Sequence, residues 1–185
     1  MIDNWVVPLV SALLGAVVGG LATYLASLAL GRRERRARYG EALLASLGAA
    51  RRKTQQTRAE FDRYSPQGTG RLKQGIQLWE EAAAISAQTG LAASLAWTSA
   101  GKRAMQGWAL HHHESLLAGV TSRAEMIWLL DQLQVGEYLV IAWVAGDARA
   151  RDFRLSRDDV VQRFGPKYRD VDMPDYPGPD NRGTS

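Results

Sequence analysis

A run of residues without Asp, Glu, Lys or Arg extends from Asn4 to Gly31 and ends at a cluster of arginines. As an α-helix, its apolar part from Trp5 to Leu30 would be roughly 39 Å long, whereas the hydrocarbon core of a bilayer is ~30 Å thick. A cleaved signal peptide has a basic start and a shorter apolar region, and neither is present here. The run therefore predicts an uncleaved, single-pass transmembrane anchor over residues 1–31, in preference to a cleaved signal or a buried core helix.

Five arginines follow the run within seven residues, and no basic side chain precedes it. Because Lys and Arg accumulate on the cytoplasmic side of membrane helices, we expect the N-terminus outside the cell (inner) membrane and the remaining chain in the cytoplasm. Anionic lipid headgroups would attract each basic side chain by about 1 kcal/mol. This position explains the arginines without nucleic acid, which is not expected as a partner. The membrane-surface candidates are Arg32, Arg33, Arg35, Arg36 and Arg38.

Composition agrees with a cytoplasmic domain. The chain has no cysteine, which excludes disulfides and thiolate metal sites. Its net charge of +4 is concentrated in residues 32–63, which hold ten Lys or Arg and four Asp or Glu.

Small side chains recur at every fourth position within the run. Such rows let two helix backbones approach closely in lipid, which predicts a helix partner and a homo-oligomer. The alternative is that the small residues face lipid without consequence. The helix-association candidates are Ser11, Gly15, Gly19, Thr23 and Ser27.

A juxtamembrane helix is predicted over residues 32–64, because apolar and small residues there recur alternately four and three apart. Such heptad spacing suits a parallel, self-associating stalk, but it equally suits packing onto the chain's own domain. Continuity with the small-residue row favours the stalk. The stripe consists of Leu43, Leu47, Ala50, Thr54, Thr57, Phe61 and Tyr64.

The remaining chain predicts a linker at residues 65–70, a helical domain at residues 71–166 and a disordered tail at residues 167–185, where Pro and Asp are frequent. Within the domain, a first helix bears the face of Leu72, Ile76, Trp79 and Ala83 and stops at Gly90. A second helix covers Leu91–Ala118, with a division near Gly101. Ser122 and Glu125 have capping-box spacing and open a third helix. Ser156 caps the last helix, which ends at Phe164-Gly165-Pro166.

The apolar segment from Tyr138 to Gly146 fits a buried strand as well as a buried helix. We favour a helix that continues from the third one. A second membrane span would bury Asp131 and Glu137 and would place the following arginines outside, against the charge rule.

No catalytic residue, cofactor or metal site is predicted. His111, His112 and His113 are consecutive, and consecutive helical side chains diverge, so a histidine cluster in the core or on the helix surface is favoured over metal ligands. Glu137 stands among apolar residues. It is interpreted as a half-exposed helix residue, with burial beside Arg103 or Arg123 as the alternative.

Several features together resemble uncharacterised single-span membrane proteins of bacteria and their phages. These features are the basic-flanked N-terminal run, the helical domain, the segment Glu137-Tyr138-Leu139-Val140-Ile141-Ala142, Gly146, and Val160 through Gly165. The resemblance covers the anchor and the last third of the domain. It implies this architecture and carries over no catalytic residues.

The sequence therefore predicts an all-α protein. We expect a membrane-anchored, non-enzymatic scaffold or regulator, encoded by a bacterium, phage or mobile element, that acts through helix association at the inner membrane face together with a protein partner. The alternative is a membrane-tethered enzyme whose site one sequence does not reveal.

Overall fold

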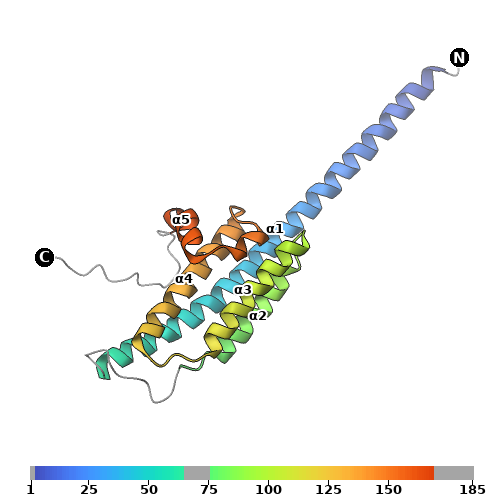
Figure 1. Ribbon diagram of the computed structural model, residues 1–185. Coiled ribbons are helices and arrows are strands. Elements are labelled where there is room, and N and C mark those ends of the chain that lie inside the picture. Colours follow the sequence, from blue (N-terminus) through green and yellow to red (C-terminus); the bar gives the residue numbers. More distant parts are fainter. Residues whose placement is uncertain (1–2, 65–75, 169–185) are drawn as a thin grey trace.

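The computed structural model describes the backbone of residues 3–64 and 76–168, and the side chains within these ranges from residue 17 onward. This part of the chain contains no β-strand, and only one isolated antiparallel bridge joins Ile76 to Val120. The prediction of an all-α fold is therefore confirmed (Figure 1). The elements are α1 (Asp3–Tyr64), α2 (Trp79–Ala93), α3 (Ser99–Leu117), α4 (Arg123–Ala145), the 3-10 helix η1 (Ala150–Arg154) and α5 (Arg157–Tyr168).

Four helices form a bundle in which each runs opposite to the preceding one. The second half of α1 packs against both α2 and α4, and α2 packs against α3. Helix α5 lies against α4, and η1 lies against α3. The first half of α1 continues beyond the bundle as a single helix (Figure 1). The bundle end from which it projects is also where α2 ends, α3 begins and α4 ends.

The prediction of a single-pass protein of the inner membrane is wrong. Within residues 3–64 and 76–168, no helix is both long enough and apolar enough to cross a membrane. The arginines that follow the apolar run belong to the same helix. The predicted orientation and cytoplasmic location depended on this span and are withdrawn with it.

The heptad stripe of α1 is buried inside the bundle. Leu43, Leu47, Ala50 and Thr54 are inaccessible to solvent and Phe61 is nearly so, whereas Tyr64 is exposed. These side chains meet the apolar faces of α2 and α4. Of the two interpretations of the stripe, packing onto the chain's own helices is the one observed, and the favoured self-associating stalk is wrong. The core thus extends across the predicted boundary between residues 32–64 and the helical domain.

The capping signal at the start of α4 acts as predicted. The Ser122 hydroxyl accepts a hydrogen bond from the Glu125 amide at 3.3 Å, and the Glu125 carboxylate accepts one from the Ser122 amide at 3.1 Å. The helix continues through Tyr138 to Ala145, as favoured, and stops at Gly146, whose φ of 92° suits a residue without a side chain.

Other predicted boundaries differ from the structure. Helix α2 starts at Trp79 and passes Gly90, and the break before α3 falls at residues 94–98, where Thr98 caps the new helix by accepting a hydrogen bond from the Gly101 amide at 3.0 Å. Helix α5 continues past Pro166 because its last turn is held by Tyr168, which is buried and donates a hydrogen bond to Asp147. The predicted linker, and the tail from residue 169, lie outside the described residues.

Candidate functional site

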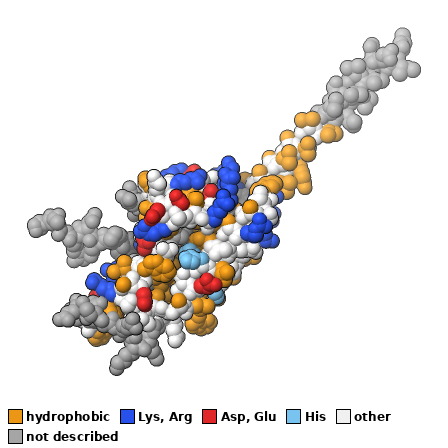
Figure 2. Space-filling model, viewed as in Figure 1, with side chains coloured by type: hydrophobic (Ala, Val, Ile, Leu, Met, Phe, Trp, Pro, Cys, Tyr) orange, Lys and Arg blue, Asp and Glu red, His pale blue; other side chains and the backbone are white. Residues whose placement is uncertain are grey.

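The projecting segment, defined as residues 17–31, presents large apolar side chains to solvent on one side and small residues on the other. The exposed fractions of its large apolar residues range from 44% for Leu28 to 63% for Val18. The space-filling view shows these side chains along the helix outside the bundle (Figure 2). Nothing in the described chain covers them.

The small-residue row can be followed over its second half only. Gly19, Thr23 and Ser27 lie in the projecting segment, whereas the side chains of Ser11 and Gly15 are outside the described residues. A Cβ atom at Gly19 would meet nothing within 4 Å. Thr23 donates its hydroxyl hydrogen to the Gly19 carbonyl at 2.9 Å, and Ser27 donates to the Tyr24 carbonyl at 2.8 Å. The hydroxyls are therefore satisfied within the helix, and this face is open to close contact.

The five arginines that follow the projecting segment do not share one environment. The Arg32 guanidinium lies 3.4 Å from the centre of the Trp97 ring. The Arg36 guanidinium lies 5.0 Å from the centre of the Trp143 ring and donates to the Ala148 carbonyl at 3.3 Å. Burial lowers the pKa of Arg36. Arg35 and Arg38 are exposed elsewhere on α1.

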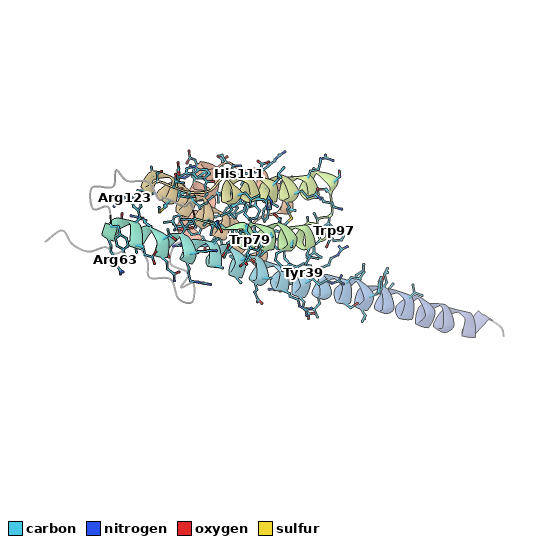
Figure 3. The ribbon with its side chains drawn as sticks, turned by 90° about the horizontal axis from the view of Figure 1, so that it is seen from below. Tyr39, Arg63, Trp79, Trp97, His111 and Arg123 are labelled. Carbon is cyan, nitrogen blue, oxygen red and sulfur yellow. The ribbon has the colours of Figure 1, made fainter. Side chains whose placement is uncertain are left out.

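A pocket of about 650 Å³ lies at the bundle end from which α1 projects. Arg32, Arg33 and Arg36 line it from one face of α1, since side chains three and four residues apart share a helix face. The segment that follows α4 adds Arg149 and Arg151 to the lining. The space-filling view shows Lys and Arg side chains gathered at this end (Figure 2), and Trp97 lies there beyond Tyr39 (Figure 3). The apolar lining comes from Ala29, Leu95, Trp97, Trp143 and Val144.

Glu137 is buried, not half-exposed, and its partner differs from both candidates. The Arg51 guanidinium donates to the Glu137 carboxylate at 2.6 Å, with the two side chains 11% and 1% exposed. Arg123 instead pairs with Asp62 at 3.1 Å. Sequence reasoning identified the unusual carboxylate but could not locate an arginine 86 residues away.

The three consecutive histidines point to different surroundings, as the divergence of helical side chains requires. His111 is exposed, and His113 meets the Ser86 hydroxyl at 3.2 Å. His112 is buried, its Nδ1 lies 3.1 Å from the Trp108 carbonyl, and its Nε2 has no hydrogen-bond partner among the described residues. This nitrogen fits against α4 because Gly136 has no side chain there; a Cβ atom at Gly136 would lie 3.3 Å from it.

Burial lowers the pKa of His112 to about 4, because a charged imidazolium would lose its hydration there. The electrostatic interaction with His111 lowers the pKa further, whereas the backbone carbonyls of Trp108 and Gln132 raise it. Leu47 of α1 and Gly136 of α4 also lie at this site. The next residue of α4, Glu137, forms an ion pair with Arg51.

The stability of the fold is therefore expected to depend on pH. A histidine whose pKa is lower in the folded state than in the unfolded state contributes most to the free energy of unfolding above its unfolded pKa of 6.5. As the pH falls from 6.5 towards 4, the free energy of unfolding decreases by up to about 3 kcal/mol. Urea unfolding at pH 8 and pH 4.5 measures this loss. His112→Met should reduce the pH dependence, and the exposed control His111→Gln should change it much less, because burial and not His111 is the main cause of the shift. An equal pH dependence of both variants would contradict this role of His112.

Several residues of the pocket escaped sequence reasoning. Arg149 and Arg151 were visible as part of a charged segment after residue 146, yet their relation to Arg32 and Arg33 depends on how α4 packs against α1. Trp97 and Trp143 looked like ordinary helix residues. The chain matches no protein-family model, no curated protein and no solved structure.

Proposed function

We propose that this chain is a non-enzymatic binding protein that assembles with further copies of itself through the projecting segment. The observation that carries the proposal is the exposure of this segment, which presents a row of large apolar side chains and holds no charged residue from Val17 to Gly31. Large exposed apolar surfaces mark interaction sites.

A second copy is the occupant that best suits this segment. It supplies an identical uncharged helix, and the row through Gly19, Thr23 and Ser27 offers a line of closest approach. The large side chains on the other face, such as Leu21 and Leu25, would then be covered by additional copies at a greater distance between helix backbones.

Binding is favoured over catalysis by the chemistry of the pocket. Among the described side chains that line it there is no carboxylate and no histidine, and hence no evident general acid or base. Its arginines and tryptophans are suited to holding a molecule.

Light scattering after size-exclusion chromatography tests this proposal. The full chain should have the mass of several copies, and residues 32–185, which lack the projecting segment, should have the mass of one. A monomeric full chain would contradict the proposal, as would an assembly that survives this truncation.

A further inference from the structure

We infer that the pocket beside the base of the projecting segment binds a small organic phosphate, with the phosphate held by its arginines and an apolar body held by its tryptophan and aliphatic wall. This binding activity goes beyond self-association and depends on different residues.

The charge of the pocket is largely uncompensated. Of its five arginines, only Arg151 has a carboxylate within ion-pair distance among the described residues, namely Asp152 at 4.0 Å. The ends of α2 and α4 and the start of α3 contribute helix-dipole charges of only about half a unit each, two negative and one positive. These partial charges cannot balance five guanidinium groups. The concave surface therefore attracts an anion, and a phosphate dianion gains more than a carboxylate.

Two of the guanidinium groups are already held in place. Arg32 is stacked at 3.4 Å on Trp97, and Arg36 is fixed by the Ala148 carbonyl and by the face of Trp143. Stacking leaves the edge of a guanidinium free, and this edge has the donor geometry that matches phosphate oxygens. Holding the groups in advance lowers the entropy lost when the anion binds.

The remaining lining indicates what the phosphate is attached to. Leu95, Trp97 and Val144 supply an apolar wall next to the arginines. A volume of about 650 Å³ falls within the ~300–1,000 Å³ range of ligand pockets and greatly exceeds what a phosphate ion fills. A phosphate monoester with an apolar or aromatic body satisfies both parts of the pocket. Such a body could be a nucleoside or an alkyl chain.

Isothermal titration calorimetry of the full chain tests this inference with adenosine monophosphate and hexyl phosphate. At least one ester should bind more tightly than inorganic phosphate, and adenosine and hexanol should bind weakly. The tighter ester identifies the source as nucleotide-like or lipid-like. Equal affinity for inorganic phosphate would contradict the role of the apolar wall, and equal affinity for the neutral compounds would contradict the role of the arginines.

A matched pair of variants locates the site. The double variant Arg32→Gln, Arg33→Gln should weaken binding by about tenfold or more, because both side chains line the pocket. The double variant Arg35→Gln, Arg38→Gln removes the same charge from the same helix outside the pocket and should change affinity by roughly twofold or less. Equal weakening by the two would show diffuse attraction to a basic surface and would overturn the inference. The oligomer mass of each variant, measured in parallel, separates this result from any failure of self-association.

Discussion

A fragment of residues 70–185, which lacks α1, is expected to lose cooperative unfolding, whereas residues 32–185 retain it. The shorter fragment loses Leu43, Leu47 and Phe61, which are at most 4% exposed in the core against α2 and α4. Replacing one such leucine by alanine costs about 2–5 kcal/mol, and whole domains are stable by only about 5–15 kcal/mol. Losing all three side chains therefore removes most or all of the stability.

Thermal and urea unfolding followed by circular dichroism measures this effect. The matched fragment of residues 32–185 lacks residues 1–31, and the described side chains of this part, residues 17–31, make no contribution to the core. Cooperative unfolding of residues 70–185 at a midpoint close to that of residues 32–185 would mean that α1 is not part of the folding unit.

Breaking the Arg51–Glu137 ion pair from either side is expected to lower the free energy of unfolding by about 3–5 kcal/mol. Glu137→Leu leaves the guanidinium in an almost fully enclosed site, and Arg51→Met leaves the carboxylate there. The remaining buried charge keeps its desolvation cost and loses the attraction of this partner.

The double variant Arg51→Met, Glu137→Leu should be much less destabilised than the sum of the two single variants, because no charge remains buried. Urea unfolding of the unsubstituted protein, the two single variants and the double variant gives the coupling energy between Arg51 and Glu137. Additive effects of the two single substitutions would show that the pair does not act as a unit.

Local patterns predicted the parts of the fold that local interactions determine. The Ser122 capping box begins α4 as predicted, because it satisfies backbone groups within a few residues. The spacing of Leu43, Leu47 and Phe61 predicted correctly that one face is buried. This spacing could not show what covers the buried face, because packing against a second copy and packing against the chain's own helices require the same spacing of apolar residues.

Contacts between distant segments could not be predicted from one sequence. The arginine cluster was interpreted as one membrane-surface feature, but the structure divides it by helix face. Arg32 meets Trp97, and Arg33 lines the same pocket as Arg149, because the bundle brings these segments together. Arg51 reaches Glu137 for the same reason. The apolar run suggested a membrane span because its length and composition suit one, whereas the described part of α1 does not qualify.

Disulfide cross-linking tests self-association through the projecting segment most directly, since the natural chain has no cysteine and any introduced one is unique. Single variants Gly19→Cys and Thr23→Cys place the thiol on the small-residue face, and the controls Leu21→Cys and Leu25→Cys place it on the opposite face. Under mild oxidation, the first two should form covalent dimers several times faster than the controls. Equal rates at all four positions would contradict the assigned face, and the absence of cross-linking at all four would contradict assembly through the projecting segment.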